Sequence, residues 1–179
     1  RILSPGGGSY SNSSSKVTGS IGIDLPQGWT NTMLSFKVKI FDYASNEHII
    51  LNIAGYNYAA SSQWYRTTAW VEGSPKDEHN FKVRFGYDNE NGKCVIIIGE
   101  ETSEWEYPKV HITDLQVGHS NYSPGQWNDG WNIWIKDNWS TLQLPNDGGV
   151  KYSIKTTQQN TQVNNWIRNN DNSIKYESG

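Results

Sequence analysis

The stretch Leu34–Ile40, LSFKVKI in one-letter code, has the clearest strand pattern in the chain. Polar residues occupy positions 35, 37 and 39, and the apolar residues around them are Leu34, Phe36, Val38 and Ile40. Successive side chains of a β-strand point to opposite faces, so this alternation predicts a strand with one buried face and one hydrated face. Residues 81–85, FKVRF, repeat the pattern and predict a second strand with one buried and one hydrated face.

Six further stretches predict more strands, because they are rich in β-branched and aromatic residues and are separated by turn residues: 17–23, 48–57, 64–72, 93–99, 109–118 and 131–136. None of them sustains the 3.6-residue apolar period of a helix. We therefore expect an all-β fold, an antiparallel β-sandwich or jelly-roll-like domain. Asn91-Gly92 predicts a hairpin turn, and a slip of the apolar phase around Asp114 predicts a β-bulge.

The composition divides the chain into three expected segments. Residues 1–16 are rich in Gly and Ser and indicate a linker or an arm that enters the domain. Residues 17–140 contain the predicted strands of the β-sandwich. Residues 141–179 form a polar C-terminal segment, rich in Asn, Gln and Thr, whose sparse apolar residues suggest that it needs a neighbour to become ordered.

The composition also excludes several classes of protein. The chain has 179 residues, of which 13% are aromatic, and a formal net charge of -3, whereas disordered chains usually combine few aromatic residues with high net charge. With 15 Lys and Arg against 18 Asp and Glu, it has little to neutralise nucleic-acid phosphates. No apolar run approaches the roughly 18 residues that a membrane span needs. Cys94, the one cysteine, cannot form an internal disulfide and is expected to be a small buried side chain.

The sequence contains no clear catalytic or metal-binding pattern. The acidic stretch Glu100–Glu106 offers paired carboxylates, which glycoside hydrolysis requires, but it also fits a hydrated turn after a strand. The four histidines are scattered and lack the spacing of metal ligands. Residues 88–92, DNENG, faintly resemble a calcium loop, and we favour a hairpin turn there. We expect no catalytic residues, no metal and no cofactor.

Aromatic side chains set among amides and hydroxyls are the outstanding chemical feature. A sugar ring has apolar C–H faces and a rim of hydroxyls, so an aromatic ring beside Asn, Gln or Arg matches it. Two clusters fit this description and give the predicted ligand-binding residues: Tyr56, Tyr58, Trp64, Tyr65 and Arg66 in the first, and Trp127, Asn128 and Trp134 in the second. Many of these rings could equally belong to the core, and we expect packing roles for Trp29, Trp105 and Trp131.

An ordered set of motifs between residues 17 and 136 resembles the distal domain of bacteriophage tail fibres, the type often followed by a self-cleaving intramolecular chaperone. The motifs are Leu25-Pro26, Trp29–Met33, Gly55–Tyr58, Trp64, Val83–Gly86, Lys93-Cys94, Ile98–Glu100, Trp105–Pro108 and Val110–Asp114. The resemblance implies an all-β homotrimer at the distal end of the fibre of a virion. It also implies attachment to a host surface glycan, either lipopolysaccharide or capsule, or to an outer-surface protein, without catalysis, nucleic acid binding or membrane insertion.

The resemblance further implies that a fibre shaft leads into residues 1–16 and that a chaperone is released after Gly179. Residues 141–179 could then pack on partner chains and bury Trp166, Ile167 and Ile174. Two other functions remain open. One is a monomeric carbohydrate-binding module of a secreted enzyme, and the other is a polysaccharide depolymerase in which Glu104 and Glu106, or Asp129, act as acid and base.

Overall fold

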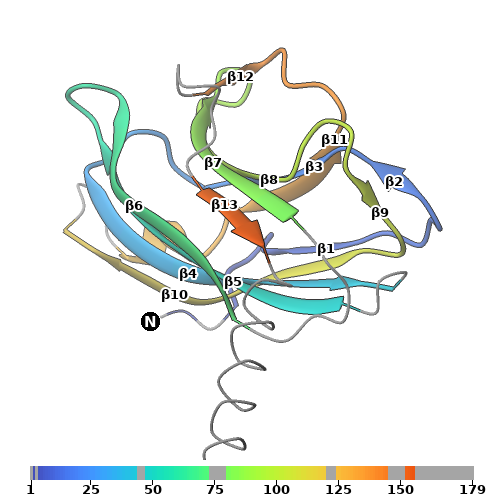
Figure 1. Ribbon diagram of the computed structural model, residues 1–179. Helices are drawn as coiled ribbons and strands as arrows, with labels where there is room; N and C mark the ends of the chain where they lie inside the picture. The colour runs from blue at the N-terminus through green and yellow to red at the C-terminus, as the bar shows by residue number, and fades with distance from the viewer. Residues whose placement is uncertain are drawn as a thin grey trace, which may run out of the picture.

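The computed structural model describes residues 2, 4–43, 47–72, 80–119, 124–144 and 152–155. In this part of the chain the fold is all-β, with one short 3₁₀ helix, η1 (Pro124–Trp127), and no α-helix. Two antiparallel sheets face one another and enclose the core between them (Figure 1). The prediction of an antiparallel β-sandwich is confirmed.

The five-stranded sheet contains the longest strands. Its order is β1 (Ser9–Ser11), β10 (Lys109–Gly118), β4 (Thr32–Asp42), β5 (Glu47–Tyr58) and β6 (Gln63–Glu72). β4 pairs with β5 along its whole length, from Thr32 opposite Asn57 to Asp42 opposite Glu47. The alternation predicted for residues 34–40 is confirmed, because the apolar positions of β4 are buried and face the other sheet.

The second sheet has six strands. Its order is β11 (Asn132–Lys136), β3 (Ser20–Asp24), β8 (Lys93–Ile98) and β7 (Asn80–Asp88), and both β12 (Leu142–Gln143) and β13 (Tyr152–Lys155) pair with β7. A small separate ladder joins β2 (Val17–Thr18) to β9 (Glu104–Trp105).

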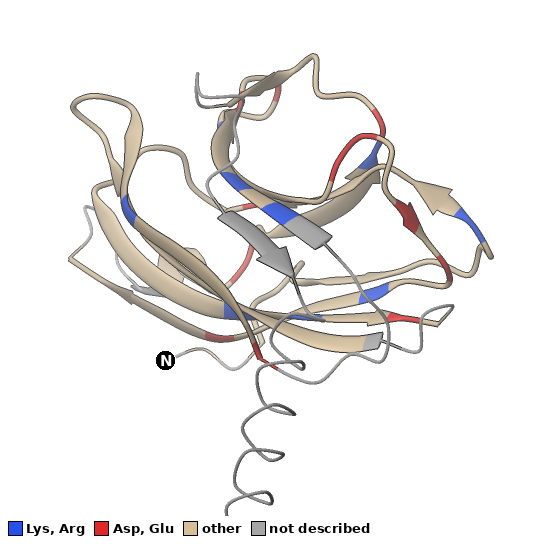
Figure 2. Cartoon of the chain, viewed as in Figure 1, with Lys and Arg blue, Asp and Glu red and all other residues tan. Residues whose placement is uncertain are grey.

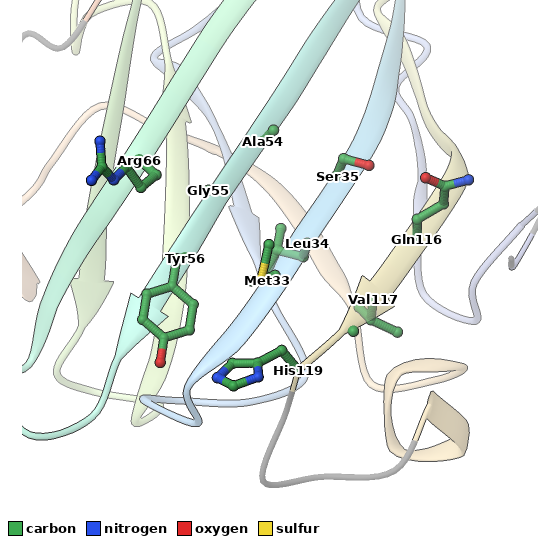
Figure 3. A pocket seen from close by; sticks show the side chains of 11 residues that line it. Met33, Leu34, Ser35, Ala54, Gly55, Tyr56, Arg66, Gln116, Val117 and His119 are labelled. Atoms are coloured by element: carbon green, nitrogen blue, oxygen red, sulfur yellow. The ribbon is translucent and has the colours of Figure 1, made fainter.

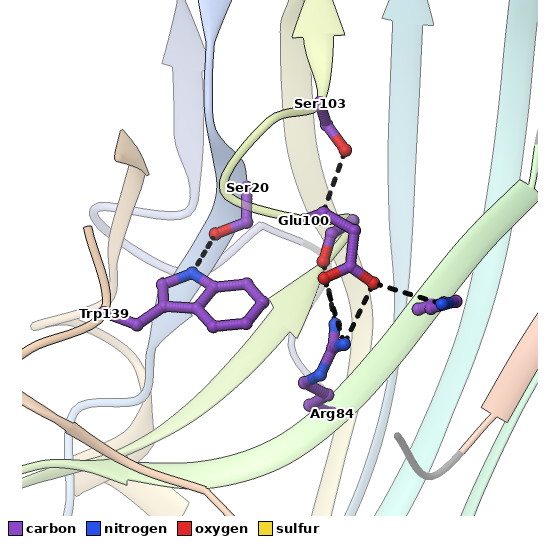
Figure 4. Close-up of polar contacts among 7 residues, drawn as sticks. Ser20, Arg84, Glu100, Ser103 and Trp139 are labelled. Atoms are coloured by element: carbon purple, nitrogen blue, oxygen red, sulfur yellow. Dashed lines mark hydrogen bonds and ion pairs between the residues drawn. The ribbon is translucent and has the colours of Figure 1, made fainter. Parts of the chain in front are cut away.

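The outer face of the six-stranded sheet is covered by Trp134 of β11 and by the chain that follows β11. Val95 and Ile97 of β8 are fully buried beneath Trp134, Trp139 and the leucines at 142 and 144. Arg84, which is 4% exposed, donates to the Gly99 carbonyl and to both carboxylate oxygens of Glu100, and its guanidinium lies 4.8 Å from the centre of the Trp139 ring (Figure 4). The Trp139 indole in turn donates to the Ser20 hydroxyl at 2.7 Å (Figure 4). Among the described residues, the broad face left open is therefore the outer face of the five-stranded sheet.

Two local predictions are confirmed. β10 contains a bulge between Thr113 and Gln116, and Asp114 has a φ of 57° there. β7 and β8 form an antiparallel hairpin closed by residues 89–92. The Asp88 carboxylate accepts hydrogen bonds from the backbone N–H groups of Glu90 and Asn91, which makes this segment a self-capped turn.

The described structure contains strands in both of the end segments. Residues 9–11, predicted to lie in a linker or an arm that enters the domain, form β1 and pair with β10, and Ile2 bridges to Leu115. Ile2 and Tyr10 hold this arm in place because they pack against the core, a contribution hidden by the surrounding Gly and Ser. At the other end, β12 and β13 pair with β7 of the same chain. The predicted partner contacts of Trp166, Ile167 and Ile174 lie outside the described residues.

Candidate functional site

The outer face of the five-stranded sheet has a hollow of about 960 Å³ near the start of β4 (Figure 3). The alternation of β4 creates one wall, because Met33 is 57% exposed while its neighbours Thr32 and Leu34 are buried. The lining comes from four segments of chain: Met33, Leu34 and Ser35 of β4, Ala54, Gly55 and Tyr56 of β5, Arg66 of β6, and Gln116, Val117, Gly118 and His119 at the end of β10.

Strand register explains why the sheet is hollowed here. One row of cross-strand neighbours runs Gly118, Met33, Tyr56 and Tyr65, and the next runs Gln116, Ser35, Ala54 and Thr68. Three of these positions have small side chains or none, namely Gly118, Ser35 and Ala54, so they form a low floor. Longer side chains rise around that floor and leave space for a ligand between them.

Aromatic rings extend from the rim of the hollow over the β5–β6 hairpin. Tyr56 and Tyr58 stack with ring centres 5.9 Å apart, and Tyr65 meets Tyr58 edge-on at 5.6 Å. His119 lies 6.1 Å from Tyr56 on the opposite side. Tyr58 and Tyr65 remain 36% and 43% exposed, and the Tyr65 hydroxyl is oriented by donating to the Gln63 side chain at 2.9 Å. Together they present an accessible aromatic surface of the kind that stacks on a sugar ring.

Arg66 reaches this surface through a β-bulge. Gly55 of β5 faces both Arg66 and Thr67 of β6, because the register shifts between Ala54 and Tyr56. The bulge holds Arg66 at a φ of 52°, which is uncommon for a residue with a side chain. Its exposed guanidinium lines the hollow on the β6 side (Figure 3).

A smaller polar hollow of about 460 Å³ adjoins the first and shares Ser35 and Gln116 with it. Lys37, Asn52 and Asp114 also line it. The amide nitrogen of Asn52 is buried and makes no hydrogen bond to any described residue, so it is a donor available to a ligand. The two hollows combine an aromatic end with a hydrogen-bonding end.

The first predicted cluster is largely brought together on this face, with one exception. Tyr56, Tyr58, Tyr65 and Arg66 share the outer surface, whereas Trp64 points inward and is half-buried. Its indole donates to the Gly86 carbonyl of the opposite sheet at 3.0 Å, and its ring packs against Trp29 and Phe85. Trp64 therefore lies apart from the other four and lines a separate hollow of about 410 Å³ with Trp29 and Tyr87, so its binding role stays a prediction.

The second predicted cluster does not form a binding surface. Trp127 is 0% exposed and lies in the core beside Trp131, which donates to the Trp127 carbonyl. Trp134 is 6% exposed and packs on Val95 in the small cluster outside the six-stranded sheet. Asn128 is exposed, but the rings of Trp127 and Trp134 are buried and cannot form an exposed aromatic surface beside it. The packing roles expected for Trp105 and Trp131 are confirmed, since both are at most 3% exposed, and Trp29 packs against the core.

Sequence reasoning missed several residues of the site, namely Met33, Ser35, Asn52, Gln116 and His119. The signal for Ser35 was present, because it lies on the predicted hydrated face of residues 34–40. The others required the pairing of β4 with β5 and of β4 with β10, which brings residues far apart in the chain into one row.

Comparison with known proteins adds no assignment, because no family model, no curated protein and no solved structure matches the chain. The site is therefore interpreted from its geometry. Within the described ranges, no helix has the length and apolar character needed to cross a membrane. The same residues contain no group of three or more His, Cys, Asp or Glu side chains arranged to hold a metal ion.

The titratable groups with altered pKa values lie away from the hollow. Burial, together with the neighbouring carboxylate of Asp88, raises the pKa of Asp24 to about 6. The Asn91 amide donates to both carboxylates, at 3.5 Å to Asp24 and 2.9 Å to Asp88. Burial also raises the pKa of the Cys94 thiol well above its usual range, so this thiol is unreactive, as its predicted buried position implies.

The carboxylates considered for a depolymerase are elsewhere as well. Glu104 forms an exposed ion pair with Lys16 at 2.7 Å, and Asp129 accepts a hydrogen bond from the N–H of Gly130 in its own turn. Neither Glu104, Glu106 nor Asp129 lines either hollow of the five-stranded sheet.

Proposed function

We propose that this chain is the receptor-binding tip of a bacteriophage tail fibre and that it attaches to a host surface carbohydrate through the outer face of its five-stranded sheet. The observation that carries the proposal is the exposed aromatic surface of Tyr56, Tyr58 and Tyr65 beside a hollow with a small-residue floor. The motif order described above motivates the tail-fibre assignment, and the ligand in view is lipopolysaccharide or capsule.

The chemistry of the surface suits a sugar better than an apolar ligand. Tyrosine rings offer flat faces to C–H groups, and their hydroxyls stay hydrated at the rim. Ser35, Asn52 and Gln116 supply hydrogen-bond donors and acceptors to hydroxyl groups at the polar end. Such a site recognises a carbohydrate by many small contacts, and its affinity per copy is modest. Assembly into a homotrimer, which belongs to this proposal, would convert modest affinity into firm attachment.

Replacing the tyrosines tests the proposed site. The full chain carrying Tyr58→Ala and Tyr65→Ala is compared with wild type for binding to purified lipopolysaccharides, capsules and intact bacterial cells. We expect binding to fall at least about fivefold, because each lost ring contact is worth about 0.5–1.5 kcal/mol. Tyr43→Ala is the matched control: Tyr43 is 64% exposed and meets Tyr107 edge-on, but it does not line the hollow.

Unchanged binding of the double variant, with an unchanged melting temperature, would overturn the assignment of the site. Light scattering on the full chain tests assembly separately. A trimer at micromolar concentration agrees with a fibre tip, whereas a monomer that still binds glycan would instead favour a carbohydrate-binding module. Shortening of the bound polysaccharide with time would identify a depolymerase.

A further inference from the structure

We infer that the glycan bound by this face is acidic and that its carboxylate or phosphate group pairs with Arg66. This inference rests on the proposed function, since it names the class of carbohydrate that the same hollow takes. The exposed tyrosines do not determine the charge of the ligand, and this inference specifies it.

The charge lining the hollow has one sign. Arg66 is the one permanently charged side chain among the lining residues, and no Asp or Glu accompanies it there. His119 adds a ring N–H donor on the far side of Tyr56. This contrasts with the chain as a whole, which is slightly acidic. A negative group entering this larger hollow would therefore meet attraction, whereas the carboxylate of Asp114 lines the adjoining polar hollow.

Arg66 also has a free guanidinium. Within the described part of the chain it forms no ion pair and no hydrogen bond, although other cations do: Lys16 pairs with Glu104, Lys37 with Glu72, and Arg84 with Glu100. β6 carries a single cation, visible as the one blue segment of that strand in Figure 2. A guanidinium offers two parallel N–H donors that match a carboxylate or a phosphate, and no described residue occupies those of Arg66.

The backbone at Arg66 indicates that the side chain is not there for stability. A residue with a side chain at a φ of 52° costs of order 1 kcal/mol or more relative to glycine. The bulge places that residue beside Tyr56 and Tyr65, the two rings paired directly across β5 and β6. A pyranose ring stacked on these tyrosines could thus extend an acidic substituent to the guanidinium.

The test uses matched acidic and neutral carbohydrates. Binding of the full chain is measured by calorimetry for two pairs of probes: oligogalacturonate against its methyl ester, and a phosphorylated mannan against the same mannan after phosphatase treatment. A set of purified acidic and neutral bacterial capsules is added to cover other sugars. We expect acidic probes to bind about tenfold or more tightly than their neutral counterparts, and the advantage to weaken with salt. The probe pair that shows the larger difference between its acidic and neutral members indicates whether the ligand carries a carboxylate or a phosphate.

Two variants locate the charge. Arg66→Gln should reduce the binding of acidic probes to the level of their neutral counterparts. Lys39→Gln is the matched control, because Lys39 lies on the same face of the sheet, forms no ion pair with a described residue and is about 20 Å along β4 from Met33 by strand rise. It should not change the binding of short acidic probes.

The possible results separate the two proposals. Equal binding of acidic and neutral probes, or acidic preference that survives Arg66→Gln, would overturn this inference while leaving a glycan-binding function in place. Failure of every probe to bind would overturn the proposed function itself.

Discussion

Gly55 of β5 lies opposite Arg66 of β6 at a β-bulge, where one residue of one strand faces two of the other. Gly55 is buried, and a Cβ at this position would meet the Trp64 ring at 3.1 Å, so the absence of a side chain lets Trp64 pack inward. The extra residue in β6 moves Arg66 out of the regular ladder and toward the open face. The pairing of Gly55 with Arg66 therefore determines both the inward position of Trp64 and the exposed position of Arg66.

Arg66→Gly should stabilise the protein while abolishing the preference for acidic glycans. Glycine adopts the positive φ without steric cost, so we expect a gain of about 0.5–1 kcal/mol in the free energy of unfolding, measured by urea denaturation. Arg66→Ala is the informative comparison, because it removes the guanidinium but keeps a Cβ at the same φ. Equal stability of the two variants would show that the backbone at 66 is not strained.

Asp24→Asn should change how stability depends on pH. Because the pKa of Asp24 is raised from 3.8 to about 6 in the folded chain, the folded state holds this proton more tightly than the unfolded state. The contribution of Asp24 to stability is therefore greatest below pH 3.8, falls as the pH rises to about 6 and is constant above that. Asparagine cannot ionise, so the variant should match wild type near pH 3.8 and exceed it at pH 7 by on the order of 1–2 kcal/mol.

Denaturation midpoints between pH 4 and pH 8 measure this difference. Asp137→Asn provides the control for removing one negative charge, because Asp137 is exposed. A constant offset between Asp24→Asn and wild type across this range would contradict the raised pKa, whereas a difference that grows through pH 4–6 agrees with it.

Trp127→Ala should unfold or strongly destabilise the protein without identifying a ligand contact. Trp127 is among the largest fully buried side chains, and truncating a buried tryptophan typically costs about 3–5 kcal/mol. Binding measured on whatever folded fraction remains should equal that of wild type, because Trp127 lies in the core away from the hollow. Loss of binding with an unchanged melting temperature would restore Trp127 as a recognition residue.

The strands could be predicted from the sequence, but the face on which each aromatic lies could not. Trp64 and Tyr65 are adjacent in one strand, so their side chains must point to opposite faces of the sheet. Because both are aromatic, the sequence does not indicate which of them lies on the outer face. The bulge then shifts the phase: Tyr65 is on the outer face before it, whereas Thr68 and Trp70 are on that face after it. A period-2 pattern extrapolated through Arg66 would assign half of β6 to the wrong side.

The covering of the six-stranded sheet was equally hidden. β8 is an apolar run buried on both faces, which is typical of a strand with a layer on each side. Nothing in the polar sequence after residue 136 indicates that Trp139 and two leucines supply the second layer. The site therefore had two possible sheet faces until the structure showed that one of them is occupied.

Gly22→Ala should destabilise this covering layer, and its effect should depend on Trp134. A Cβ at position 22 would lie 2.1 Å from the Trp134 ring, which is closer than any tolerated contact, so either the ring or β3 must move. Overpacking of this kind typically costs about 1–3 kcal/mol. Because Trp134 is the neighbour that clashes, Gly22→Ala should cost much less in a Trp134→Leu background, where the smaller side chain leaves room.

A double-mutant cycle by urea denaturation tests this coupling. We expect the two substitutions to be non-additive by about 1 kcal/mol or more, since the residues are in direct contact. Neither change should affect glycan binding, because both positions lie on the six-stranded sheet and the proposed site lies on the other. Additive effects would mean that Trp134 does not pack over Gly22, and the outer face of that sheet would then be an alternative location for a binding surface.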